Sequence, residues 1–159
     1  MPASRSAAAA ESDRAIEISR VIDAPRERVF DAFTDAGHIS LWWGPRGFTT
    51  TTHSMDVRPG GVWRFIMHGP DGTDYGNRIT YTEVVRPERL AYEHDTGEHN
   101  DPGLFHATIT FDAVGKRTRL TLRMVFATVE QYEGMKEFGA VEGGEQTLER
   151  LGEYIAKAE

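Results

Sequence analysis

The sequence contains no cysteine among its 159 residues. Disulfide bonds, thiolate catalysis and cysteine-ligated zinc are therefore excluded, and the chain is compatible with any redox compartment. Positive charge is also scarce, since 18 Lys and Arg stand against 25 Asp and Glu and the formal net charge is -7. No block of like charges is long enough to follow a phosphate backbone, so we expect no nucleic-acid partner.

Long apolar runs are missing as well. No run approaches the roughly 18 residues of a membrane-spanning helix, and the N-terminal segment MPASRSAAAAESDRA has no hydrophobic core of signal-peptide length. We therefore expect no membrane partner and a cytoplasmic location. Residues 1–14 are rich in Ala and Ser without a periodic apolar face, which predicts a mobile tail, or alternatively a cleaved targeting sequence, before a single domain at 15–159.

The spacing of apolar residues predicts the order of helices and strands. Residues 15–23 alternate as a strand does, and the segments at about 25–33 and 34–42 are typical of two short helices. Six strands separated by turns rich in Pro and Gly follow them. From about Thr128 the period becomes that of one long helix. The apolar face of this helix contains Leu148, Leu151 and Ile155.

This order of elements predicts an α+β fold. Consecutive antiparallel strands form a wide twisted sheet, and the terminal helix is the one element large enough to cover its concave face. Gly139, Gly143 and Gly144 interrupt the helical pattern, although each glycine costs about 1 kcal/mol relative to alanine in a helix interior. They have three interpretations: sheet aromatics approach the helix backbone there, the helix breaks, or small residues keep a ligand cavity open.

Four segments of the chain resemble one family. APRERVFDAFTDAGHISLWWGP at 24–45, MDVRPGGVWRF at 55–65, the Pro-Glu-Arg-Leu at 87–90 and EQTLERLGEYI at 145–155 are similar to the START-like (SRPBCC) superfamily. Within it they resemble the bacterial branch related to the C-terminal domain of activators of the Hsp90 ATPase. The resemblance covers about 16–156 and implies the helix-grip fold. In this fold a curved antiparallel sheet wraps around a long C-terminal helix, with two short helices after the first strand.

The resemblance also implies a hydrophobic pocket between sheet and helix, since the superfamily is known for pockets that bind lipids, sterols, polyketides and plant metabolites. The adjacent tryptophans at 42 and 43 would lie at the rim of the sheet, where they either complete the core or wall the pocket mouth. Large apolar residues that alternate inward on the strands, or lie on the inner face of the helix, complete the lining. The predicted lining is Trp42, Trp43, Phe48, Trp63, Phe65, Met67, Tyr81, Phe105, Met124, Phe126, Met135, Phe138 and Val141.

Few polar residues are candidates for chemistry in this pocket. His53 and His106 lie within predicted strands and are candidates for general bases or hydrogen-bond donors, and Arg78 is a candidate partner for a ligand carboxylate. Ordinary strand positions outside the pocket are the alternative for all three. EHDTGEHND at 93–101 has the composition of a metal site but also that of an exposed hairpin loop. We predict the loop, and hence no metal and no other cofactor.

Three classes of function remain open. The first is the binding or carriage of a small hydrophobic or aromatic ligand. The second is an enzyme of the cyclase, hydrolase or dehydratase type that uses the same cavity, with its catalytic residues unassigned. The third is a chaperone-cofactor-like module, but an Hsp90-type chaperone is the least favoured partner because we recognise only one domain. A homodimer is compatible with the sequence. Convergent titratable groups in the cavity would favour the enzyme, and an apolar cavity the carrier.

Overall fold

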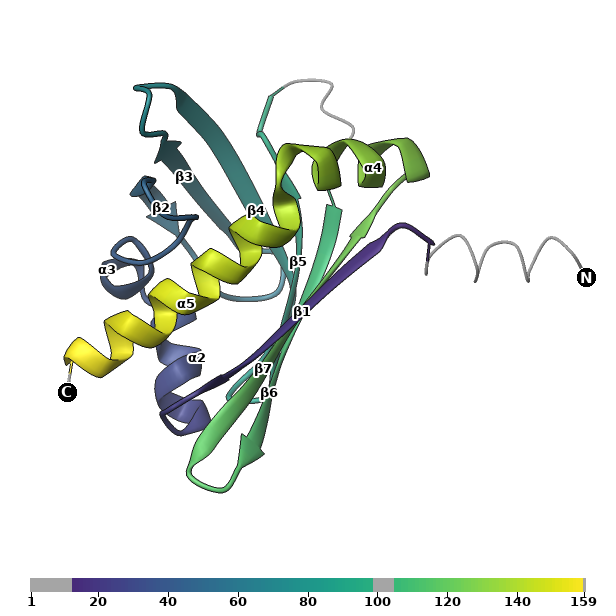
Figure 1. Cartoon of the computed structure of the whole chain (residues 1–159). Helices are drawn as coiled ribbons and strands as arrows, with labels where there is room; N and C mark the ends of the chain where they lie inside the picture. Colours follow the sequence, from purple (N-terminus) through teal and green to yellow (C-terminus); the bar gives the residue numbers. More distant parts are fainter. Residues whose placement is uncertain (1–12, 99–104, 159) are drawn as a thin grey trace, which may run out of the picture.

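A computed structural model describes residues 13–98 and 105–158 of the chain (Figure 1). The predicted tail at 1–14 therefore lies, except for its last two residues, outside the described residues. The described strands form one antiparallel sheet of seven strands in the order β1-β7-β6-β5-β4-β3-β2. Their bounds are β1 Ala15–Ile22, β2 Thr49–Met55, β3 Val62–His68, β4 Asp74–Val85, β5 Arg89–Asp95, β6 Phe105–Val114 and β7 Arg117–Phe126.

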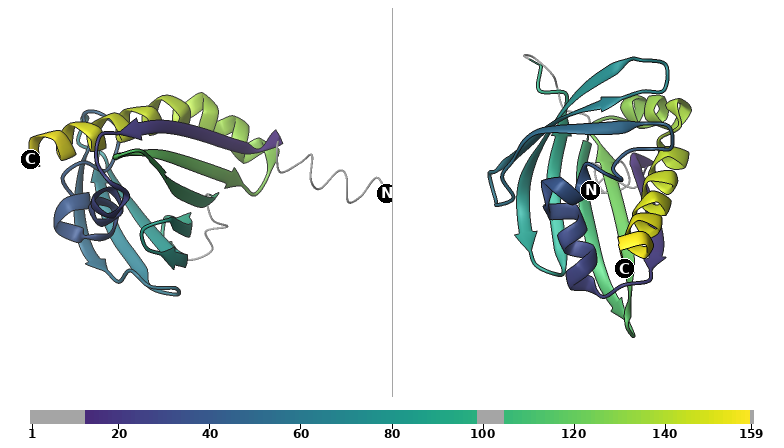
Figure 2. Two further views of the ribbon diagram at one scale, coloured as in Figure 1. Left: turned by 90° about the horizontal axis from the view of Figure 1, so that it is seen from below. Right: turned by 90° about the vertical axis from the view of Figure 1, so that its left-hand side faces the viewer.

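The sheet is curved, and helices lie on its concave side (Figure 2). The described helices are α2 Arg26–Thr34, α3 Ala36–Ile39, α4 Val129–Phe138 and α5 Ala140–Ala158. Leu148, Leu151 and Ile155 of α5 are 2%, 0% and 2% exposed, because the apolar stripe of the helix faces the sheet. The predicted helix-grip fold is thereby confirmed.

The two short helices close one end of the concave face. Asp35 lies between them and caps α3. Its carboxylate accepts hydrogen bonds from the backbone N–H groups of Gly37 and His38 at 2.8 and 3.2 Å. The apolar face of α2 packs against β6, β7 and α5. Phe30 and Phe33 of this face lie with their ring centroids 5.2 and 5.5 Å from that of Phe111. The end of the sheet beneath α2 is therefore filled with side chains.

The predicted long C-terminal helix is in fact two helices. Gly139 ends α4 in the left-handed conformation, with φ 99°, and α5 begins at the next residue. Residues other than glycine rarely adopt this backbone conformation, so the left-handed end of α4 accounts for the glycine at this position. Of the three interpretations of the helix glycines, a helix break is the correct one for Gly139.

Gly143 and Gly144 do not keep a cavity open. A Cβ atom on Gly144 would lie 2.4 Å from Cδ1 of Ile18 in β1, and one on Gly143 would lie 3.6 Å from Cγ of Pro45. Gly144 therefore lets α5 approach β1 closely, whereas a Cβ atom on Gly143 would make only an ordinary van der Waals contact with Pro45. The interpretation as cavity-forming residues is wrong because the space above them is already occupied by Ile18 and Pro45.

Replacing Gly144 by leucine is expected to lower the free energy of unfolding by about 1 to 3 kcal/mol, because the new side chain overpacks the contact with Ile18. Urea denaturation measures the effect. Gly134→Ala in α4 is the matched control, since a Cβ there meets nothing within 4 Å. It is expected to raise stability by up to about 1 kcal/mol. A Gly144→Leu variant as stable as the parent would show that α5 is not in close contact with β1.

Candidate functional site

The concave face of the sheet carries a continuous aromatic surface. Trp63 and Phe65 of β3 stack on one another, with ring centroids 3.8 Å apart and an interplanar angle of 21°. Trp43, from the loop after α3, meets both rings edge-on at centroid distances of 5.4 and 6.4 Å. The two β3 rings are each 1% exposed, whereas Trp43 is only partly buried. Trp43 therefore lies at the border between the aromatic core and more open space.

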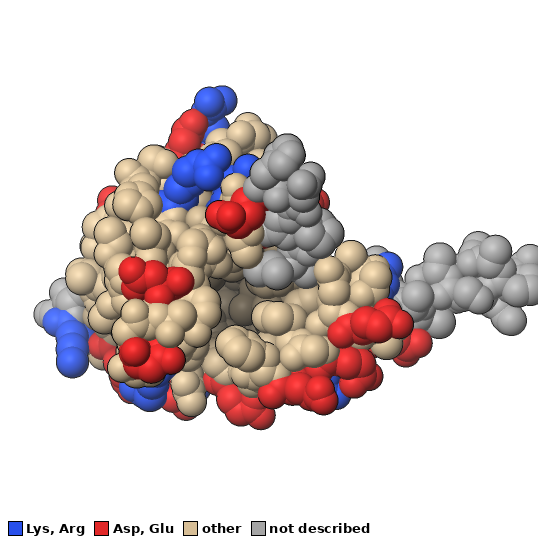
Figure 3. All heavy atoms as spheres, turned by 90° about the horizontal axis from the view of Figure 1, so that it is seen from above, with Lys and Arg blue, Asp and Glu red and all other residues tan. Residues whose placement is uncertain are grey.

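Burial of the concave face decreases toward α4. Met67 at the end of β3, Phe105 at the start of β6, and Tyr132 and Met135 of α4 pack against the core but are only partly buried. The end of the molecule that carries α4 and the β3–β4 turn is seen in Figure 3, and it is hollowed at its centre. We refer to this space as the hollow. Met67, Phe105 and Met135 belong to elements that meet at the same end of the molecule.

Two tyrosines lie side by side on the concave face. Tyr81 of β4 and Tyr92 of β5 are cross-strand partners, with ring centroids 6.4 Å apart, and each is 3% exposed. Neither hydroxyl forms a hydrogen bond with another described residue. Neither hydroxyl oxygen is completely enclosed by protein atoms. A water molecule can therefore reach both oxygens.

The environment of the two tyrosines keeps their hydroxyls neutral. Burial raises the pKa of Tyr92, and burial followed by the neighbouring Tyr92 raises the pKa of Tyr81. An ordinary tyrosine has a pKa of about 10, so a further increase leaves both groups protonated at neutral pH. They can therefore donate hydrogen bonds but do not act as bases.

A histidine and an asparagine lie next to the tyrosines, closer to the hollow. Nε2 of His94 is 2.8 Å from Oδ1 of Asn77, and because an amide oxygen only accepts, Nε2 carries the proton of this hydrogen bond. The ring of His94 is 8% exposed and lies 4.9 Å from that of Phe105. The prediction of an exposed loop is wrong for His94. This residue belongs to β5, and its side chain lies on the same inward face of the strand as that of Tyr92.

The rest of the acidic segment is part strand and part loop. Residues 96–98 form the predicted loop, with Gly97 in the left-handed conformation at φ 82°. Asp95 ends β5 and accepts two hydrogen bonds from Arg78, at 2.9 and 2.8 Å. Residues 99–101 lie outside the described part of the chain. Among the described residues, no three His, Cys, Asp or Glu side chains are grouped so as to hold a metal ion.

Most of the predicted lining residues come together on the concave face. Trp42 is an exception, since its buried ring packs against α2, 4.8 Å from that of Phe33, and its Nε1 donates to the carbonyl of Ala32 at 3.2 Å. Phe48 lies at the rim, with its ring centroid 6.1 Å from that of Tyr75. Phe138 is 76% exposed at the end of α4, so its assignment to the lining is wrong. The residues in or against the core are Trp43, Trp63, Phe65, Met67, Tyr81, Phe105, Met124, Phe126, Met135 and Val141.

The three polar candidates from the sequence lie outside the interior. His106 alternates with the inward-facing Phe105 and therefore points to the convex face. Arg78 is engaged with Asp95, and His53 is exposed where the register of β2 shifts. The polar groups of the interior are instead Tyr81, Tyr92, His94 and Asn77.

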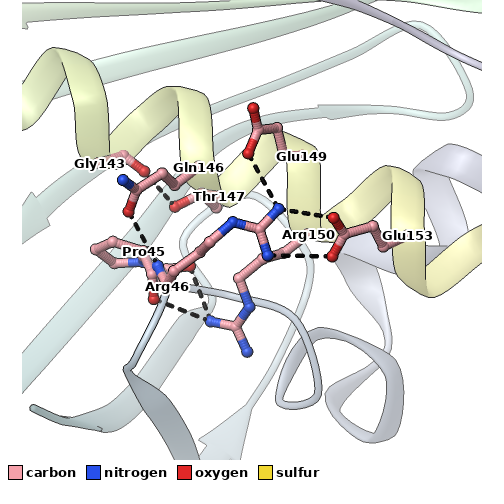
Figure 4. Close-up of polar contacts among 9 residues, drawn as sticks. Pro45, Arg46, Gly143, Gln146, Thr147, Glu149, Arg150 and Glu153 are labelled. Carbon is pink, nitrogen blue, oxygen red and sulfur yellow. Dashed lines mark hydrogen bonds and ion pairs between the residues drawn. The ribbon is translucent and has the colours of Figure 1, made fainter. Parts of the chain in front are cut away.

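The loop at 43–48, which carries Trp43, is fastened to α5 by Arg150. Nη1 of Arg150 donates to the carbonyl oxygens of Gly44, Pro45 and Phe48 at 2.9, 3.2 and 3.1 Å. Figure 4 shows Arg150 beside Pro45. The carbonyl of Pro45 also accepts from the backbone N–H of Phe48 at 3.1 Å, and the two N–H groups of Nη1 are shared among the three carbonyls. Arg150 therefore fixes the path of the loop and, through it, the position of Trp43.

Arg46 fastens the same loop from the solvent side. Its guanidinium lies 3.0 Å from a carboxylate oxygen of Glu149 and 2.6 Å from one of Glu153, and its backbone N–H donates to Oε1 of Gln146 at 3.1 Å (Figure 4). The side chain of Arg46 is 47% exposed. Exposed ion pairs contribute little to stability, so Arg46 is expected to matter less than Arg150.

Replacing Arg150 by alanine is expected to lower the free energy of unfolding by about 1.5 to 3 kcal/mol, because several charge-assisted hydrogen bonds to loop carbonyls are lost together. Arg46→Ala, which removes a guanidinium from the same loop contact, is expected to leave stability nearly unchanged. Thermal or urea unfolding of the two variants tests this difference. Equal losses from both would mean that the carbonyl contacts of Arg150 have no special role.

Another concavity lies on the outside, between α2, α3 and the end of α5. It has a volume of about 480 Å³ and shares no residue with the aromatic surface. Its lining is Pro25, Glu27, Arg28, Asp31, Ala32, His38, Tyr154 and Ile155. The mixture of charged and apolar groups gives this groove no single chemical character, and the hollow remains the better candidate site.

The fold and the aromatic interior define a START-like protein of the helix-grip class. Residues 23–156 match the family described as Activator of Hsp90 ATPase homolog 1-like protein (AHSA1), and the chain belongs to this family. No curated protein matches the chain. None of the described helices is both long and apolar enough to cross a membrane.

Solved structures of bacterial proteins share the fold. A protein from Nitrosomonas europaea is 23% identical, with a TM-score of 0.84 over 92% of this chain and 97% of that one. A protein from Arthrobacter aurescens is 25% identical, with a TM-score of 0.84 over 92% and 88% of the two chains. The AHSA1 protein from Silicibacter pomeroyi is 20% identical, with a TM-score of 0.73 over 91% and 99%. Identities at this level support the fold and leave the function to be argued from the site.

Proposed function

We propose that the chain binds a small hydrophobic or aromatic molecule in the hollow between the sheet and helices α4 and α5. The observation that carries the proposal is the aromatic surface of Trp43, Trp63 and Phe65, which continues into partly buried residues beneath α4. Ligand pockets are typically apolar and aromatic, with a few polar groups that orient the ligand. Covering the remaining apolar area is favourable by about 25 cal/mol per Å².

An enzyme that uses the same hollow is the second candidate. The observation that favours it is the convergence of Tyr81, Tyr92 and His94 on the concave face. Binding ranks first because the two tyrosines are hydrogen-bond donors rather than bases at neutral pH. A protein that only binds its ligand needs no further group.

The proposal is tested by titrating the purified chain with 2-ethylnaphthalene, a neutral aromatic hydrocarbon, and following the fluorescence of the tryptophans that border the hollow. A saturable change with one site per chain supports the proposal. Native mass spectrometry of the protein from its source complements the titration, since a copurifying small molecule would identify the ligand. A purely linear fluorescence response together with a chain free of bound molecules would contradict the proposal.

A further inference from the structure

The hydroxyls of Tyr81 and Tyr92 are unusual for residues that only pack a core. Each residue occupies an inward position of its strand, next to the exposed Thr82 or Glu93, and each is 3% exposed. Burying a hydroxyl without a hydrogen bond costs about 1 to 3 kcal/mol, and phenylalanine would fill the same position without this cost. No described residue supplies an acceptor, so water or part of a ligand is available as the partner of the two hydroxyls.

The two tyrosines continue a line of polar groups that begins nearer the hollow. Asn77 and Tyr81 are inward residues of β4, and His94 and Tyr92 are inward residues of the adjacent β5. The hydrogen-bonded pair of His94 and Asn77 lies toward the α4 end, and the tyrosine pair lies deeper. A molecule that enters the hollow with a polar group foremost therefore meets the hydrogen-bonding groups of β4 and β5 beside the aromatic rings of β3, on the same face of the sheet.

The charges around this line favour a neutral ligand. Arg78 is on the convex face with Asp95, and the donor atom of Arg150 is engaged with carbonyls of the 43–48 loop. Tyr81 and Tyr92 are themselves neutral, because burial raises the pKa of each. A carboxylate or phosphate next to them would meet no Lys or Arg among the inward residues of β4 and β5, and the net charge of -7 further disfavours anions.

We infer that the ligand of the hollow is a neutral aromatic or conjugated ring compound that carries a carbonyl or similar acceptor oxygen, bound by the hydroxyls of Tyr81 and Tyr92. The inference rests on the proposed binding function. The partly buried ring of Trp43 supplies the surface for the ring system, and the stacked rings of Trp63 and Phe65 support it from behind. The tyrosine hydroxyls select the oxygen, since a site that hydrogen-bonds a ligand group discriminates against analogues that lack it.

Two probes of the same shape test the inference. 2-Acetylnaphthalene and 2-ethylnaphthalene share a ring system and differ in one carbonyl oxygen, so their affinities are compared by titration calorimetry on the parent chain and on Tyr81→Phe and Tyr92→Phe. Each variant is expected to weaken binding of the acetyl compound about fivefold. Binding of the ethyl compound should stay within about twofold, because the hydroxyls add nothing to an apolar ligand. Tyr154→Phe, in the outer groove, is the control and should change neither affinity.

The outcomes separate the inference from the proposed function. If the parent chain binds neither probe, the binding function fails and the inference falls with it. If the parent chain binds both probes, two results overturn the inference alone: the variants leave the affinity for the acetyl compound unchanged, or they lower the affinities for both probes equally. In either case the tyrosines only bind water or pack the interior. Far-ultraviolet circular dichroism of each variant confirms the fold, which the removal of one oxygen atom is expected to preserve.

Discussion

Trp63→Ala is expected to lower the free energy of unfolding by about 3 to 5 kcal/mol, the largest loss of stability among the substitutions considered. Trp63 is 1% exposed, stacks on Phe65 and contacts the ring of Trp43 at 5.4 Å. Its Nε1 also donates to Oγ1 of Thr52 at 3.1 Å, a hydrogen bond that the variant loses. Urea denaturation monitored by circular dichroism measures the effect.

Phe138→Ala is the control for this loss of an aromatic side chain. Phe138 is 76% exposed, so its removal is expected to change stability by no more than about 0.5 kcal/mol. A loss from Phe138→Ala comparable with that from Trp63→Ala would mean that α4 packs differently and that Phe138 belongs to the lining after all. A small loss from Trp63→Ala would contradict the tightly packed aromatic surface.

Trp43→Ala is expected to weaken binding of 2-ethylnaphthalene at least about tenfold, which corresponds to about 1.4 kcal/mol. Trp43 is the member of the aromatic surface that is only partly buried, so it offers ring surface to a ligand while Trp63 and Phe65 lie behind it. An aromatic contact of this kind contributes about 0.5 to 1.5 kcal/mol beyond the area it buries. Fluorescence of the remaining tryptophans, or calorimetry, measures the affinity.

Leu41→Ala is the matched control for Trp43→Ala. Leu41 is also an apolar residue near the end of α3, but it is 64% exposed to solvent. Its removal should leave the affinity for 2-ethylnaphthalene unchanged. If Trp43→Ala retains full affinity while both variants remain folded, Trp43 is a packing residue and the ligand does not reach it.

The fold was predictable from the sequence because most strands bury one face. Period-two alternation in segments such as 62–68 and 117–126 identifies strands, and the change of period after Thr128 identifies the helical end of the chain. The break at Gly139 was not predictable, because a glycine in a helical pattern is compatible with an interior position, a cap or a close contact. The backbone conformation of Gly139 identifies it as a helix cap, and the contact with Ile18 of β1 identifies Gly144 as a point of close approach between residues far apart in sequence.

The apolar part of the site was predictable for the same reason, and the polar part was not. The alternation of Leu90, Tyr92 and His94 indicates one inward face, but the acids around His94 gave this segment the composition of a loop. His106 directly follows Phe105, and neighbouring residues of a strand point to opposite faces, so an inward Phe105 implies that His106 lies on the convex face. The contacts of Arg150 with the 43–48 loop span more than a hundred residues and leave no local pattern in the sequence.

Methyl-resolved NMR of the chain with labelled methionine and isoleucine, titrated with 2-ethylnaphthalene, tests the central claim most directly. Met67 and Met135 pack partly buried beside the hollow, whereas Ile155 lines the outer groove between α2, α3 and α5. Ring currents of a bound aromatic molecule shift nearby methyl signals. We predict saturable shifts of the Met67 and Met135 signals with no change at Ile155. Shifts confined to Ile155, or none at all, would contradict a binding site between the sheet and its helices.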